Sequence, residues 1–108
     1  AMASHLPYLM ACTTTTAAES CIPKDQFDMF KQSIASGFKD TTRVAQSNPQ
    51  WGVDICRGNT AAIREGLVAA KQDIERLLAL LDEGESSELF AQFRRAQSIQ
   101  ESLRSEDL

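Results

Sequence analysis

Two short stretches of the sequence combine residue types that could recognise a negatively charged ligand. The first holds His5, the only histidine of the chain, directly before Leu6 and Pro7. Because proline is favoured in the first turn of a helix, we expect His5 to lie at a helix amino terminus, where backbone N–H groups and the helix dipole favour an anion. An imidazole there could share a hydrogen bond with a carboxylated ligand. The alternative is that His5 is an ordinary surface or capping residue.

The second stretch runs from Ser36 to Arg43 and contains a carboxylate and a guanidinium three residues apart. At this spacing Asp40 could orient Arg43 to bind a substrate carboxylate through two parallel hydrogen bonds. The simpler interpretation is a local salt bridge on a turn, worth about a few tenths of a kcal/mol. Gly37 would allow a close backbone approach beside them. The spacing leaves both interpretations open.

Other kinds of chemistry are not indicated. Cys12, Cys21 and Cys56 form no CxxC pair, and with a single histidine they offer no zinc-ligand spacing. We therefore expect no metal site, and free thiols in a cytoplasmic chain. A formal net charge of −4 argues against binding to nucleic acid or to an anionic membrane surface. No segment approaches the roughly 20 apolar residues of a membrane-spanning helix.

The elements that must position these residues are predicted to be helices throughout the chain. In the second half, six apolar residues recur at alternating spacings of four and three, which places them on one face of a helix. They are Ile63, Leu67, Ala70, Ile74, Leu77 and Leu81. A second apolar stripe consists of Leu89, Phe93, Ala96, Ile99 and Leu103. Gly84 can end the first helix and Ser86 or Ser87 can cap the second, so we expect a long antiparallel hairpin.

The first half is predicted to contain shorter helices. The first helix is expected from Leu6 to Ala18. A second follows Pro23, has Phe27, Phe30 and Ile34 on its core face and ends at Ser36-Gly37. A helical turn over Thr41–Gln46 then precedes a helix that is capped by Asn48, starts at Pro49 and breaks at Gly58-Asn59. The hydroxyls of Thr13–Thr16 can bond carbonyls one turn earlier and so be buried. The tail Glu101–Leu108 is expected to fray. The fold class is therefore all-α, with about six helices in a single domain over residues 1–108, which we expect to form an intertwined homodimer through its apolar stripes.

Several motifs of the chain resemble the carboxyl-terminal helical domain of prephenate and arogenate dehydrogenases. The stretches that carry the resemblance are Ser4-His5-Leu6-Pro7-Tyr8-Leu9, the segment from Ser36-Gly37-Phe38-Lys39-Asp40-Thr41-Thr42-Arg43 to Val44-Ala45, Asn48-Pro49, Asp54-Ile55 and Asn59. The first two are fairly specific, because they occur in the family in the same order and at about the same separation. The resemblance extends over nearly the whole chain.

This resemblance implies a dimerisation domain that completes a substrate pocket between itself and a preceding dinucleotide-binding domain. The full enzymes oxidatively decarboxylate prephenate, or oxidise arogenate, with NAD or NADP on the route to tyrosine. Arg43 resembles the arginine that holds a substrate carboxylate, and His5 resembles the first histidine of the substrate-side motif. Asp40, Ser36, Gly37 and Tyr8 occupy positions that line the pocket. The implied partners are a second copy, the dinucleotide-binding domain and a small dicarboxylate substrate.

The chain also departs from the family pattern. No GxGxxG motif follows a strand, so we expect no cofactor to bind this chain itself. The family's catalytic histidine belongs to the other domain, so no catalytic residue is expected here. Tyr8 stands where many members have a second histidine, and Gly52 where many have tryptophan. Because Ala1-Met2 resembles a cloning remnant close to the first motif, we interpret the chain as a fragment that does not turn over substrate by itself.

Two other functions remain to be weighed against this one. A stand-alone all-α homodimeric interaction module would need the same apolar stripes but no pocket. A small helical enzyme similar to chorismate mutase would need several cations directed into one pocket. Arg64, Lys71 and Arg76 instead lie off the apolar stripe, which argues against such an enzyme.

Overall fold

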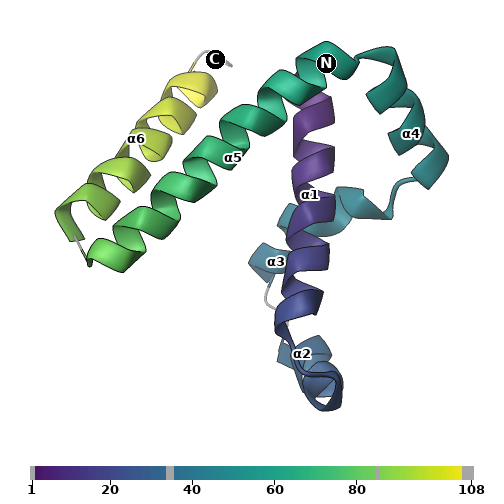
Figure 1. Ribbon diagram of the computed structural model, residues 1–108, viewed down its shortest axis with the longest axis horizontal. Coiled ribbons are helices and arrows are strands. Elements are labelled where there is room, and N and C mark those ends of the chain that lie inside the picture. The colour runs from purple at the N-terminus through teal and green to yellow at the C-terminus, as the bar shows by residue number, and fades with distance from the viewer. Residues whose placement is uncertain (1, 34–35, 85, 106–108) are drawn as a thin grey trace. The chain divides into compact units, whose positions relative to one another are not determined.

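The computed structural model describes residues 2–33, 36–84 and 86–105, and within these ranges every regular element is a helix. The elements in chain order are α1 (Met2–Cys21), η1 (Lys24–Gln26), α2 (Phe27–Ser33), α3 (Ser36–Thr42), η2 (Arg43–Gln46), α4 (Pro49–Gly58), α5 (Thr60–Glu83) and α6 (Ser86–Ser105), where η denotes a 3₁₀ helix (Figure 1). The all-α class and the six α-helices are confirmed. None of the described helices is long and apolar enough to cross a membrane.

The helix boundaries of the first half differ from those predicted. Helix α1 begins at Met2 and places Pro7 in its interior. Proline already has a helical φ angle, so the chain can remain helical on both sides of it at the cost of one backbone hydrogen bond. The predicted start at Leu6 and end at Ala18 were therefore both wrong. The hydroxyls of Thr15 and Thr16 do donate to carbonyls one turn earlier, but these threonines are exposed rather than buried.

Ser36 and Gly37 begin a helix instead of ending one. A serine suits a helix start as well as a loop, and Gly37 has no positive φ that would stop a helix. The apolar face predicted before it is only partly covered: Phe27 is exposed and Phe30 half-buried, while Ile34 lies outside the described residues. The 3₁₀ helix η2 confirms a helical turn before Ser47, although it starts at Arg43.

The capping signals around α4 and α5 are confirmed. The Asn48 side chain accepts a hydrogen bond from the backbone N–H of Gln50 at 2.8 Å, and Pro49 occupies the first helical position. Helix α4 ends at Gly58 as predicted. Gly84, after α5, has a φ of 70°, a left-handed conformation that glycine adopts without strain.

Contacts divide the chain into two compact units, residues 1–67 and 68–108, with the boundary inside α5. In the first unit, α1 packs against α3 and η2, and its buried side chains include Tyr8, Ala11 and Ile63. In the second, α6 lies beside α5 as the predicted hairpin (Figure 1), and the side chain of Arg76 donates to that of Gln92 at 3.2 Å.

Helix α6 is regular as far as Ser105, so the predicted fraying was wrong for Glu101 and the residues after it up to that point. Residues 106–108 lie outside the described part. Arg64, Lys71 and Arg76 are all exposed, as expected from their places off the apolar stripe. The stripe itself is buried at Ile63, but Ile74 and Leu81 are exposed in this single chain.

Candidate functional site

Three aromatic rings meet where α1 faces α4. The rings of Tyr8 and Trp51 are in edge-to-face contact with centroids 4.9 Å apart, and those of His5 and Trp51 are in a similar contact at 6.3 Å. Tyr8 is almost fully buried, with 7% of its surface exposed, whereas Trp51 is 41% exposed. Edge-to-face contact is a favoured geometry for aromatic pairs, so Trp51 links His5 to Tyr8.

The imidazole of His5 has an unsatisfied atom. Its Nδ1 is buried and has no hydrogen-bond partner in the structure. Most buried polar atoms in proteins are paired, so an unpaired one calls for a partner such as a ligand, a water molecule or another polypeptide. This supports the interpretation of His5 as a residue that meets a group from outside the described chain.

Tyr8 rests directly on the backbone of Gly52. A Cβ atom added at Gly52 would lie 2.6 Å from the Tyr8 hydroxyl oxygen and 3.0 Å from the nearest ring carbon. While Tyr8 holds this position, only glycine fits at position 52, because any other residue would add a Cβ that clashes with the ring. Positions 8 and 52 are therefore in direct contact with each other.

The hydroxyl end of Tyr8 lies beside two thiols. Hydrogen bonding to the side chain of Cys12, followed by desolvation, raises the pKa of Tyr8 above its ordinary value of 10.0, and the nearby Cys56 contributes in the same direction. All three cysteines of the chain are free thiols. Tyr8 is therefore a neutral phenol at physiological pH, able to donate or accept a hydrogen bond but not to supply charge.

Asp40 and Arg43 form the predicted ion pair. One Asp40 carboxylate oxygen lies 3.5 Å from Nη1 of Arg43, and the two side chains are 71% and 69% exposed. An exposed pair with this geometry contributes little to stability. The pair can still orient the guanidinium, whose remaining N–H groups stay available for a carboxylate.

Two further predicted site residues lie on α3, which packs against α1. Ser36 and Gly37 form the start of α3 and are exposed. A Cβ at Gly37 would have no atom within 4 Å among the described residues, so none of these makes the close approach that the glycine permits. The packing of α1 on α3 and η2 brings together the elements that carry the two sequence motifs.

An open hollow of about 450 Å³ lies between α1 and α4. Its lining consists of Tyr8, Leu9, Cys12, Pro49, Gly52, Val53, Cys56 and Arg57. The lining is mostly apolar, and its residues with polar groups are Tyr8, Arg57 and the two thiols Cys12 and Cys56. Arg57 forms no ion pair with any other described residue. A hollow of this composition could accept an apolar body that carries a negative charge.

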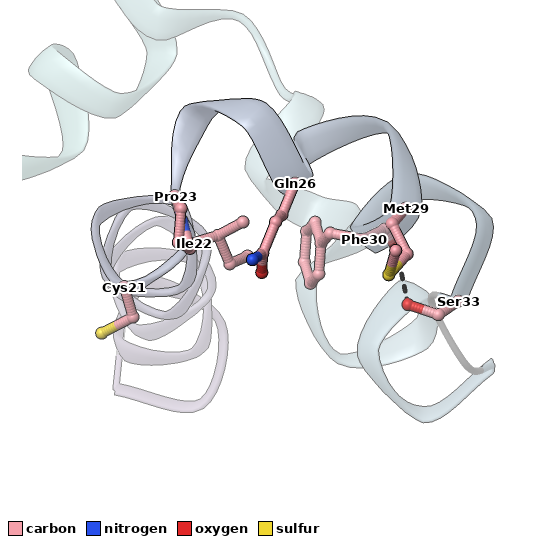
Figure 2. Close-up of a pocket in the computed structure, with 7 residues that line it drawn as sticks. All are labelled: Cys21, Ile22, Pro23, Gln26, Met29, Phe30 and Ser33. Carbon is pink, nitrogen blue, oxygen red and sulfur yellow. Dashed lines mark hydrogen bonds between the residues drawn. The ribbon is translucent and has the colours of Figure 1, made fainter.

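A second hollow, of about 280 Å³, lies where the end of α1 meets α2 (Figure 2). In Figure 2 the side chain of Gln26 lies between Ile22 and Phe30, and the thiol of Cys21 points away from them. Ser33 donates its hydroxyl to the Phe30 carbonyl at 3.1 Å. No charged residue lines this hollow, so it offers nothing to hold an anionic ligand.

The described residues contain neither a strand–turn–helix unit nor a group of metal-ligating side chains. A dinucleotide is usually held by a glycine-rich turn between a strand and a helix, and the part of the chain that the structure describes contains helices only. Within the same part, no three histidine, cysteine or acidic side chains are grouped to hold a metal.

Trp51 is a site residue that the sequence pattern does not single out, because nothing local links it to His5 across 46 positions. Its only local signal is its place in the first turn of α4, two residues after Pro49.

Comparison with known proteins gives consistent matches. The model of the family described as "Prephenate dehydrogenase, dimerization domain" matches residues 1–95. The chain is 24% identical over 100 residues to the prephenate dehydrogenase of Bacillus subtilis (strain 168), a match that covers 93% of this chain and 26% of that protein. The crystal structure of Synechocystis arogenate dehydrogenase is similar with a TM-score of 0.85 and 24% identity, over 93% of this chain and 36% of that one. The chain thus spans about a quarter to a third of these relatives.

Proposed function

The chain belongs to the prephenate dehydrogenase dimerization-domain family, and from that premise we propose that it provides the dimer interface and one side of the substrate pocket of an NAD(P)-dependent prephenate or arogenate dehydrogenase. The observation that carries the proposal is the family match over residues 1–95. It is supported by the packing of α1, which holds His5, against the segment that holds Arg43.

The proposed reaction is the oxidative decarboxylation of prephenate to 4-hydroxyphenylpyruvate, or the corresponding oxidation of arogenate, in tyrosine biosynthesis in the cytoplasm. NAD or NADP, the oxidant, is proposed to bind the separate dinucleotide-binding domain. Because the sequence has no GxGxxG motif after a strand, and the family's catalytic histidine belongs to the other domain, we expect the chain to be inactive alone.

The role of Arg43 is to hold a substrate carboxylate. Substrates of this class carry two carboxylates, so they need fixed cations. Asp40 accepts from Nη1 of Arg43 and thereby restricts the guanidinium, whose other N–H groups can form two charge-assisted bonds of about 1.5–3 kcal/mol each. His5 supplies a further hydrogen bond, and Ser36, Gly37 and Tyr8 line the pocket around them.

The proposed assembly is a homodimer. The second unit exposes large apolar side chains on both of its helices, including Leu81, Phe90 and Phe93. A second copy of the chain would remove them from water, which is the dominant favourable contribution to protein association.

The test uses the complete reading frame in which this domain occurs. We expect the purified protein to reduce NAD or NADP in the presence of prephenate or arogenate. Replacing Arg43→Ala should lower kcat/KM roughly a hundredfold, equivalent to about 3 kcal/mol of lost binding. Lys31→Ala, which removes an exposed cation from α2, is the matched control and should leave kcat/KM unchanged. An unaltered kcat/KM in Arg43→Ala would remove this residue from the site.

The exposed apolar side chains also fit a second candidate, a stand-alone helical interaction module without catalysis. The DNA immediately upstream of the Met2 codon distinguishes the two. An open frame that encodes a strand–GxGxxG–helix unit supports the dehydrogenase, whereas an in-frame stop codon supports the module.

A further inference from the structure

The contact between Tyr8 and Gly52 lies next to a series of ring contacts that leads to His5. Trp51 is adjacent to Gly52 in the chain, and its ring contacts both Tyr8 and His5. The three rings therefore form a continuous series from a buried tyrosine to a histidine with an unpaired buried nitrogen.

We propose that Tyr8 is a positioning residue of the substrate site: by resting on Gly52 it fixes Trp51, and Trp51 in turn fixes the imidazole of His5 for a carboxylated substrate. This inference rests on the proposed function, because it concerns how His5 meets that substrate. It assigns a role to the two positions at which the chain departs from its family.

The tyrosine is the fixed member of the series. Its ring is 7% exposed, is bounded on one side by the bare backbone of Gly52, and has its hydroxyl beside Cys12. Glycine in a helix interior is unfavourable relative to alanine. Its presence in α4 is explained by the ring, since any larger residue would place a Cβ within 2.6 Å of the phenol oxygen.

The indole, in contrast, is not held by burial. Trp51 is 41% exposed, so its orientation depends on the few groups that it contacts. Tyr8 is the closer of its two aromatic neighbours, at 4.9 Å against 6.3 Å for His5. Removing the tyrosine ring should therefore release the indole, and the imidazole with it.

The first experiment compares two glycines of the same helix. Gly52→Ala should displace the Tyr8 ring, whereas Gly58→Ala is the matched control, because a Cβ there has no atom within 4 Å. The chain has one tryptophan and one histidine. The near-ultraviolet circular dichroism of Trp51 and the ring-proton NMR shifts of His5 therefore report on the site without labelling. We expect Gly52→Ala to reduce the Trp51 band and shift the His5 resonances, and Gly58→Ala to change neither.

The second experiment changes the tyrosine itself, which keeps the proposal testable if Gly52→Ala fails to fold. Tyr8→Phe retains the ring and should retain both spectroscopic signatures. Tyr8→Leu should lose both, while its far-ultraviolet spectrum stays helical. In the complete dehydrogenase, Tyr8→Leu should raise the substrate KM, whereas the control Gly58→Ala should not.

The outcomes separate this inference from the proposed function. Unshifted His5 resonances in a folded Tyr8→Leu chain, or an unchanged KM in the Tyr8→Leu enzyme, would overturn the positioning role. A wild-type enzyme that oxidises neither prephenate nor arogenate would instead overturn the proposed function, whatever the spectra of the ligand-free chain show.

Discussion

The two compact units, residues 1–67 and 68–108, differ in how far they bury their apolar side chains. The first unit buries Tyr8, Ala11 and Ile63, and it orders its aromatic rings through specific contacts. In the second unit Leu80 is the one described apolar side chain that is buried, and Phe90 and Phe93 are 71% and 58% exposed. Both units consist of helices that carry regularly spaced apolar residues, so helical propensity does not explain why only the first unit buries several of them.

This difference in burial indicates which unit is stabilised by contacts within the chain and which unit needs a partner. A pair of helices gains most of its stability from burying an apolar face, and the hairpin of α5 and α6 buries little within its own chain. Large exposed apolar patches in a soluble protein mark interaction sites. The first unit is therefore suited to hold a site, and the second is suited to hold a partner, which we propose is a second copy.

The largest expected effect follows from breaking the exposed face of the hairpin. Replacing Phe90→Glu together with Phe93→Glu places two charges where the proposed dimer buries aromatic rings. Because buried aromatic anchors each contribute about 2 kcal/mol or more to an interface, the loss of two should raise the dimer dissociation constant by roughly a thousandfold. Analytical ultracentrifugation measures this change.

Ser98→Glu provides the control, because it adds a charge to an exposed polar position of the same helix. It should leave the dissociation constant near its wild-type value. If the double phenylalanine variant sediments like the wild type at every concentration, the dimer does not use this face of α6.

A smaller effect is expected from the helix cap in the first unit. Asn48→Ala removes the side-chain acceptor for the Gln50 N–H and should lower the free energy of unfolding by about 1 kcal/mol. Since the cap is local, the loss should be the same at all protein concentrations, unlike the loss caused by the phenylalanine changes. Thermal unfolding of Asn48→Ala and Asn48→Asp at several concentrations checks this, and the aspartate should restore stability.

The smallest effect concerns the Tyr8 hydroxyl. Its pKa is raised above 10.0 by Cys12 and by desolvation, so folding favours the protonated phenol. The corresponding stabilisation is complete below pH 10 and is lost as the pH rises through the raised pKa. Tyr8 is the only tyrosine, so the ionisation absorbance near 295 nm should titrate above that of free tyrosine amide. A midpoint at or below the free value would contradict this environment, and Tyr8→Phe should show no transition.

Local patterns predicted much of the fold. The alternating apolar spacing located α5 and α6, and Gly84 and the Asn48-Pro49 pair marked helix boundaries that the structure confirms. These signals succeed because capping and left-handed termination depend on residues within one turn of each other. The helix boundaries predicted from Pro7 and from Ser36-Gly37 were wrong, because these residues fit more than one position in a helix. The surrounding packing determines which position each one takes.

The candidate site was predictable only in part. The Asp40–Arg43 pair is local and appears as its spacing predicts. The contacts of Trp51 with His5 and Tyr8 join helices far apart in the sequence, and no periodicity encodes such a contact. The requirement for glycine at position 52 becomes visible only when the space around its Cα is known.

The contact of the Tyr8 ring with the bare Gly52 backbone also constrains how this sequence can evolve. A side chain at position 52 is excluded while tyrosine occupies position 8, but a smaller residue at position 8 first opens the space. Substitutions at the two positions are therefore expected to be epistatic and to have a preferred order. A path from this chain to one with tryptophan at position 52 must change Tyr8 before it changes Gly52.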